Sequence, residues 1–159
     1  MGYERGKRVP LLLNVHGGPA GVFTQTRRFK AASVGAGVTN LMSFNGTADI
    51  PGFIPDYFGA ESWENLELYR AHSAMFQVKG VTTPTLILHG ANDERVPTGQ
   101  AYELYRGLKD RGKTTELVFY PREGHGFTEY YHQRDRMQRI YDWVTKYTLG
   151  SGGNRTIAQ

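Results

Sequence analysis

An acidic residue and a histidine each follow an apolar stretch of the sequence, at the point where that stretch ends. In LILHGANDERVP the apolar residues stop at His89 and Gly90, and Asp93 comes in the loop that follows. In LVFYPREGHGF they stop at Pro121, and His125 stands between two glycines. A carboxylate that hydrogen-bonds to an imidazole fixes its tautomer, and the imidazole can then act as a general base. Taken alone, Asp93 is better explained as a turn cap and His125 as an ordinary loop histidine. Together, at the ends of consecutive strands, they predict a catalytic pair.

Glycines follow the first apolar stretch as well, in NVHGGPAG. His16, Gly17 and Gly18 come directly after that stretch. Because glycines let backbone N–H groups approach a ligand closely, these residues are a candidate oxyanion-binding turn. A tight turn without a ligand explains them equally well.

Ser33 is the candidate nucleophile. It stands in AASVG, which fits the pattern A-x-S-x-G, and the order Ser33, Asp93, His125 is that of α/β-hydrolases. A nucleophile elbow also needs a helix after the serine, whereas the VGAGVTNLM that follows Ser33 contains glycines and β-branched residues that start a helix poorly. Three further serines lie in an irregular segment without an elbow pattern: Ser43, Ser62 and Ser73.

A sheet is needed to bring these residues together, and four short apolar runs predict one. The runs cover residues 9–15, 29–36, 83–89 and 115–120. Their hydrophobicity is continuous rather than alternating, which is typical of strands buried on both faces of a parallel sheet.

Two amphipathic helices are expected beside the later strands, so the order of elements predicts an α/β fold. The first lies within residues 97–112, with Thr98 as its N-cap and Gly112 just past its end. Its apolar residues recur at helical spacing: Ala101, Leu104, Tyr105 and Leu108. The second helix follows the last strand, and spacing predicts its buried stripe: Met137, Ile140, Tyr141, Val144 and Thr148.

The remaining segments are less regular. Residues 40–80 contain several Gly and Pro residues and sequence for one or two short helices, which is typical of a pocket wall or a lid. Residues 150–159 are polar and glycine-rich, and a disordered tail is predicted there.

Composition narrows the function classes. The formal charge of +4 is modest and spread along the chain, so no nucleic-acid partner is expected. The absence of Cys excludes disulfides and a Cys nucleophile. No apolar run is long enough for a membrane span and no signal-peptide pattern is found, so a cytoplasmic protein without a membrane partner is expected.

No metal or other cofactor is expected either. The residues that would have to hold a metal are His16, His89, Asp93 and His125. They lack the helical His-x-x-x-His spacing of many metal sites, and His89 is expected to point into the fold.

Five stretches together resemble the catalytic α/β-hydrolase domain of the prolyl oligopeptidase family of serine peptidases. They are LLLNVHGGPAG, RFKAASVGAGVTNLMSF, YFGAESWENLELYRAHSAM, TPTLILHGANDERVPTGQAYELYRGLK and ELVFYPREGHGF. The resemblance implies that residues 1–149 form a truncated α/β-hydrolase fold, a mostly parallel sheet flanked by helices. It also implies that Asp93 is the acid and His125 the base of a Ser-Asp-His triad, with the oxyanion region at His16 and the glycines after it.

The sequence departs from this family between the HGGP turn and the RFKAA strand. Relatives hold there two further strands, their helices and the GWSYGG nucleophile elbow, whereas GVFTQT here runs directly into RRFKAAS. In the family the missing elbow strand lies between the strands that correspond to residues 9–15 and 29–36. These two strands are therefore predicted to be able to pair directly, through a link that is near the minimum length for a parallel crossover.

Two functions follow from these observations. The first is a serine hydrolase that acts on small esters and short peptides through Asp93 and His125, with Ser33 or an activated water as the nucleophile. The second is a catalytically inactive fold. Because lost helices would leave apolar surface uncovered, a homo-oligomer or strand-exchanged dimer is expected as well.

Overall fold

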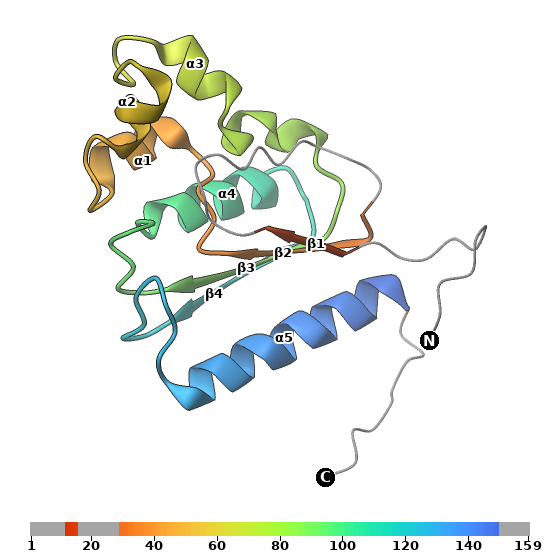
Figure 1. Cartoon of the computed structure of the whole chain (residues 1–159). Coiled ribbons are helices and arrows are strands. Elements are labelled where there is room, and N and C mark those ends of the chain that lie inside the picture. The colour runs from red at the N-terminus through yellow and green to blue at the C-terminus, as the bar shows by residue number, and fades with distance from the viewer. Residues whose placement is uncertain (1–11, 16–28, 150–159) are drawn as a thin grey trace, which may run out of the picture.

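Four parallel strands form the centre of the fold, and helices cover both faces of the sheet (Figure 1). The computed structural model describes residues 12–15 and 29–149. The strands follow one another across the sheet in chain order: β1 Leu12–Val15, β2 Ala31–Gly35, β3 Thr85–Gly90 and β4 Thr115–Tyr120. The predicted α/β fold, a parallel sheet flanked by helices, is confirmed.

β1 and β2 are direct neighbours in this sheet. Leu13 lies opposite Ala32, and Val15 lies opposite Val34, in parallel register. The pairing that the sequence made possible is thus present: the two strands meet where an elbow strand would separate them in relatives. The link between them, residues 16–28, lies outside the described residues.

One face of the sheet is covered by α4, Gly99–Lys109, together with short helical segments. Ala101, Leu104 and Leu108 of α4 are buried against Val34 and Ile87 of the sheet, as their spacing predicted. The short segments lie between β2 and β3: α1 Leu41–Thr47, α2 Phe53–Phe58, α3 Leu66–Ala71 and the 3-10 helix η1 Ala74–Gly80. Gly112 follows α4 with a φ of +65°, a conformation that favours glycine. Thr98 occupies the N-cap position, but its side chain makes no capping hydrogen bond.

The other face is covered by α5, Tyr130–Thr148 (Figure 1). Its predicted stripe was partly wrong, because Met137 is 68% exposed and Tyr141 is also exposed. The residue at the centre of the contact is Trp143, which is buried, with Ile140 and Tyr147 packed beside it. The stripe that faces the sheet is therefore rotated around the helix from the one that the spacing of Met and Tyr indicated.

The short helices are tied to α4 by the buried side chain of Gln100. Its Oε1 accepts hydrogen bonds from the backbone N–H groups of Thr39 (2.9 Å) and Asn40 (2.8 Å). Its Nε2 donates to the Ser43 hydroxyl, at 2.9 Å. This one amide therefore fixes the chain just before α1.

Gln100→Ala is expected to lower the free energy of unfolding by about 1–3 kcal/mol, because it leaves buried N–H groups without an acceptor. Urea unfolding followed by circular dichroism measures the loss. Gln77→Ala, at an exposed glutamine of η1, is the matched control and should change stability by less than about 0.5 kcal/mol. Equal midpoints for the two variants would contradict the role of Gln100.

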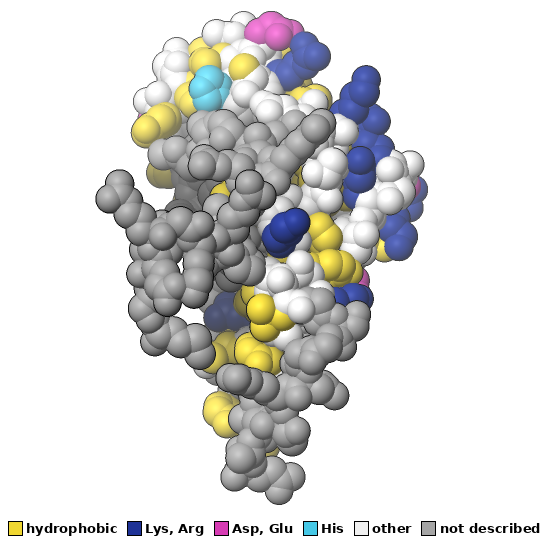
Figure 2. Space-filling view, turned by 90° about the vertical axis from the view of Figure 1, so that its right-hand side faces the viewer, with side chains coloured by type: hydrophobic (Ala, Val, Ile, Leu, Met, Phe, Trp, Pro, Cys, Tyr) yellow, Lys and Arg dark blue, Asp and Glu magenta, His cyan; other side chains and the backbone are white. Residues whose placement is uncertain are grey.

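Large apolar side chains also reach the surface. Figure 2 shows hydrophobic side chains in separate groups among polar ones on the face that lies at the right of Figure 1. The exposed ones over the described residues are Phe53, Tyr57, Trp63, Leu66, Phe76, Tyr102, Tyr130, Tyr131, Met137, Tyr141 and Leu149. Within the same part of the chain, no helix combines the length and apolar character that a bilayer span requires.

Candidate active site

The structure brings Asp93 and His125 together at the carboxyl ends of β3 and β4. His125 donates a hydrogen bond from Nδ1 to Oδ2 of Asp93, at 3.1 Å. The Asp93 side chain is fully buried, and its Oδ1 accepts from the backbone N–H of Val96 at 2.9 Å. The His125 side chain is 47% exposed. A buried carboxylate thus orients an imidazole that remains accessible to a reactant.

Close backbone packing holds the two loops together. The backbone N–H of Ala91 donates to the carbonyl of Tyr120 (2.9 Å), and that of Asn92 donates to the carbonyl of Glu123 (2.8 Å). Gly90 lies against the backbone of residues 123–124: a Cβ at Gly90 would come within 2.5 Å of the Glu123 carbonyl oxygen. A glycine is needed there because the loop that carries His125 occupies the space of a side chain.

His89 is a second imidazole beside Asp93, fully buried as expected from the sequence. Its Nε2–H donates to the carbonyl of Val96 at 2.7 Å and lies 3.5 Å from Oδ2 of Asp93. Its Nδ1 has no hydrogen-bond partner in the part of the chain that the structure describes. Burial lowers the pKa of His89, although the Val96 carbonyl and Asp93 oppose that shift. A neutral His89 therefore helps to shape the Asp93 turn and is not itself placed as a base.

Ser33 is not brought to this pair. It lies in the middle of β2, 2% exposed, with its Cα opposite that of Leu86 in β3. β3 continues to Gly90, four residues further, so Ser33 is roughly 13 Å short of the carboxyl edge at about 3.3 Å per residue.

The Ser33 side chain also faces α5, whereas a nucleophile elbow would expose it at the carboxyl edge of the sheet. Ala31 packs in the cluster on the α5 side of the sheet, and Val34 packs in the cluster on the α4 side. Because successive strand side chains alternate, Ser33 faces α5. The strand-to-helix turn of a nucleophile elbow is not formed at Ser33, and its role as nucleophile stays a prediction. The oxyanion candidates His16, Gly17 and Gly18 lie outside the described residues.

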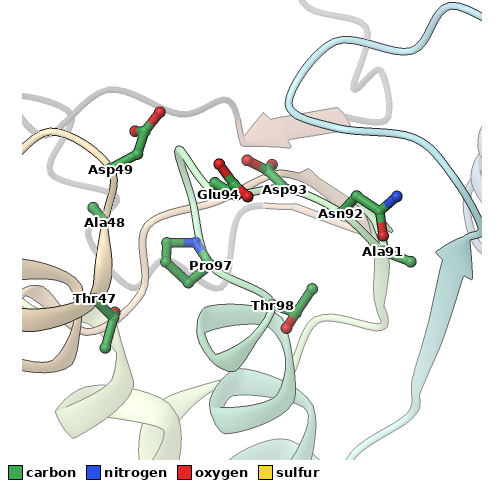
Figure 3. Close-up of a pocket in the computed structure, with 9 residues that line it drawn as sticks. All are labelled: Thr47, Ala48, Asp49, Ala91, Asn92, Asp93, Glu94, Pro97 and Thr98. Carbon is green, nitrogen blue, oxygen red and sulfur yellow. The ribbon is translucent and has the colours of Figure 1, made fainter.

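A cavity of about 640 Å³ opens beside Asp93 (Figure 3). Thr47, Ala48 and Asp49 form one of its walls, so the segment 40–80 does contribute the predicted pocket wall. The opposite side comes from the loop after β3: Ala91, Asn92, Asp93, Glu94, Pro97 and Thr98. The two sides are held by an ion pair between Asp49 and Arg95 (2.6 Å), which lowers the pKa of Asp49. Its lining includes Asp93 but not His125, so the cavity adjoins the carboxylate side of the pair.

Sequence reasoning missed Glu123, which is buried two residues before His125. Among the described residues, a group that could hold a metal ion consists of Glu123, Glu129 and His132, with ligand atoms within 4.8 Å of one another. These atoms already have partners: Glu123 accepts from His132 Nδ1, and Glu129 pairs with Arg122 at 2.7 Å. The cluster therefore serves as a set of hydrogen bonds around the start of α5.

Comparisons with known proteins show the family of this chain. The profile of the Prolyl oligopeptidase family matches residues 19–151. A peptidase of Bacillus subtilis, YuxL, is 38% identical over 138 residues, which cover 82% of this chain and 21% of that protein. The acylamino-acid-releasing enzyme of Arabidopsis thaliana is 30% identical over 159 residues, which cover 91% of this chain and 21% of the enzyme. The chain thus spans about a fifth of the length of these relatives.

Solved structures show the same fold. An acylaminoacyl peptidase of Pyrococcus horikoshii superposes with a TM-score of 0.82 at 23% identity, over 94% of this chain and 26% of that one. A puromycin-hydrolyzing peptidase of Mycobacterium tuberculosis superposes with a TM-score of 0.73 at 25% identity, over 86% of this chain and 22% of that one. The described sheet and helices therefore match part of these larger peptidases.

Proposed function

Because the chain belongs to the prolyl oligopeptidase family, we propose that it is a serine-hydrolase-type catalyst of small esters and short peptides that works through Asp93 and His125. The observation that carries the proposal is the 3.1 Å hydrogen bond from His125 Nδ1 to the buried Asp93. It fixes the tautomer in which Nε2 of His125 is free to accept a proton. The names of the relatives, a peptidase and an acylamino-acid-releasing enzyme among them, support peptides as one substrate class.

In the proposed reaction His125 is the general base. Its Nε2 takes the proton of the attacking hydroxyl or water, whose oxygen forms a bond to the carbonyl carbon of the substrate. The bond from that carbon to the leaving alcohol or amine then breaks, and His125 returns the proton to the leaving group. Asp93 holds the imidazole throughout, and the backbone N–H groups after His16 are the proposed oxyanion donors.

Two groups are candidates for the attacking oxygen, the Ser33 hydroxyl and a water molecule activated by His125. The burial of Ser33 on the α5 side of β2 favours the water. A water attacks without forming an acyl-enzyme, so this route is expected to be slow and to show no covalent adduct.

A second candidate function rests on the same burial. With Ser33 inside the strand layer, the chain is a self-associating α/β fragment that keeps an acid and a base but has no serine for them to activate. Loss of the serine leaves rates orders of magnitude below those of an intact triad. Self-association, by a homo-oligomer or an exchanged strand, is part of this second proposal.

Hydrolysis of a p-nitrophenyl ester by the purified chain tests the proposed function. Wild type is expected to exceed the buffer rate, and His125→Ala to lose about 10²-fold or more of that excess, because general base catalysis is typically worth this much. His72→Ala is the matched control, since His72 is an exposed histidine at the end of α3 and should leave the rate unchanged. This control is needed because any exposed imidazole can hydrolyse an activated ester. Equal rates in His125→Ala and His72→Ala would contradict the proposal.

Ser33→Ala and a fluorophosphonate probe identify the nucleophile in the same preparation. Only an activated serine gains the probe's mass, so a water route predicts no adduct and an unchanged rate in Ser33→Ala. An adduct on Ser33 would assign the serine instead. Buffer rates in every variant, with no adduct, would favour the inactive fragment.

A further inference from the structure

Glu123 links three segments: the loop that carries Asp93, the loop that presents His125, and the start of α5. Its backbone carbonyl accepts a hydrogen bond, at 2.8 Å, from the N–H of Asn92 in the loop that carries Asp93. Its side chain belongs to the loop that presents His125, and it is only 1% exposed. A buried carboxylate requires partners that offset its loss of hydration.

Those partners come from the far end of the same loop and from the first turn of α5. Oε2 of Glu123 accepts from the backbone N–H of Thr128 at 2.8 Å, and Oε1 accepts from that of Glu129 at 2.9 Å. Oε1 also accepts from Nδ1 of His132, on α5, at 3.0 Å. One carboxylate thus joins both ends of the segment 123–129, with His125 between them.

The charge of Glu123 fits this arrangement. Burial opposes its ionisation, but the hydrogen bonds from Thr128, Glu129 and His132 outweigh burial, so the pKa of Glu123 lies below its ordinary value. Hydrogen bonds to an ionised acceptor are shorter and stronger than those between neutral groups. An ionised Glu123 is therefore able to hold the loop in one conformation.

We propose that Glu123 is a positioning residue for the candidate base, because its carboxylate fixes the 123–129 loop so that Nδ1–H of His125 meets Asp93. That His125 acts as a base rests on the proposed function, but the positioning of its ring by Glu123 does not. A carboxylate that only caps α5 would leave the contact between Asp93 and His125 unchanged when it is removed. That difference separates positioning from a purely structural role.

The experiment is nuclear magnetic resonance of the ¹⁵N-labelled chain, with the Nδ1–H signal of His125 as the readout. We expect the hydrogen bond to the buried Asp93 to slow exchange of this proton with water. In Glu123→Gln the amide presents an NH2 group to at least one of the N–H donors, so the loop is released and the His125 signal is expected to be lost. The indole N–H of Trp143, which donates to the Pro84 carbonyl at 3.3 Å, reports in the same spectrum that the fold is intact.

Glu129→Gln is the matched control on the same loop. It removes the ion pair with Arg122 and the charge of Glu129 that lies 3.5 Å from His132 Nδ1, but it keeps the backbone N–H that donates to Glu123. The His125 signal is expected to remain in this variant. Its loss here as well would show that any disturbance of the loop has the same effect, and would overturn the specific role of Glu123.

His132→Phe is a second variant that keeps an aromatic ring beside Tyr120, where the His132 ring now lies at 5.5 Å, and removes one donor to Glu123. A weakened His125 signal is expected. An unchanged His125 signal in both Glu123→Gln and His132→Phe would overturn the proposal. Loss of the Trp143 signal together with the His125 signal would overturn it as well, because Glu123 would then support the whole fold. Because these variants are compared by their spectra and not by hydrolysis, the result can be interpreted even if the chain proves to be inactive.

Discussion

Replacing Trp143 by alanine is expected to lower the free energy of unfolding by about 3–5 kcal/mol, the cost typical of removing a large buried aromatic residue. Trp143 is buried against Leu86, Leu88 and Tyr120, and it is the buried residue of the one helix that covers this face of the described sheet. Since small domains are stable by about 5–15 kcal/mol in total, this loss is a large share of the stability, and the unfolding midpoint should move to clearly lower urea concentration or temperature. Urea or thermal unfolding followed by circular dichroism measures this without relying on the fluorescence that the substitution removes.

Tyr141→Ala on the same helix is the control for this experiment. Tyr141 belongs to the stripe that spacing predicted, but its side chain is 46% exposed. Its truncation should change stability by about 0.5 kcal/mol or less. If instead Tyr141→Ala were as destabilising as Trp143→Ala, the orientation of α5 on the sheet would be wrong.

The contrast between these two residues shows what the sequence could predict of the fold. Continuous apolar runs located all four strands, and the run at residues 115–120 gave the bounds of β4 as observed. The helix α5 was placed correctly, but its buried face was not. Met137 and Tyr141 are as apolar as the residues that are buried, so hydrophobic spacing alone did not distinguish the two stripes; contact with Leu86 and Leu88 decides which one is buried.

The candidate acid and base could be paired from the topology alone, before any resemblance to a family was used. Residues at the carboxyl ends of adjacent parallel strands must meet at one edge of the sheet, which is why Asp93 and His125 could be paired from the sequence. Glu123 and Gln100 could not be found in this way, because Glu and Gln are usually exposed and their residue types point to the surface. Their roles depend on backbone N–H groups that only the folded loops bring near.

Gly90→Ala is the second substitution expected to have a large effect, because it acts directly on the junction between the two loops of the site. The added methyl group would meet the carbonyl groups of Glu123 and Gly124, which are backbone atoms and cannot move aside as a flexible side chain can. The loop that carries His125 must then shift away from β3. Overpacking of this kind costs about 1–3 kcal/mol and sometimes more, and the hydrogen bond between Asp93 and His125 is expected to be lost.

Gly46→Ala is the matched control for that substitution. Gly46 lies in α1 with no atom within 4 Å of an added Cβ, so alanine fits and should raise stability by about 0.4–1 kcal/mol. Chemical unfolding and the Nδ1–H signal of His125 are measured for both variants. We expect Gly90→Ala to lose stability and the signal while Gly46→Ala keeps both. A Gly90→Ala chain that unfolds at the wild-type midpoint and retains the signal would show that the two loops are not in the close contact on which the candidate site depends.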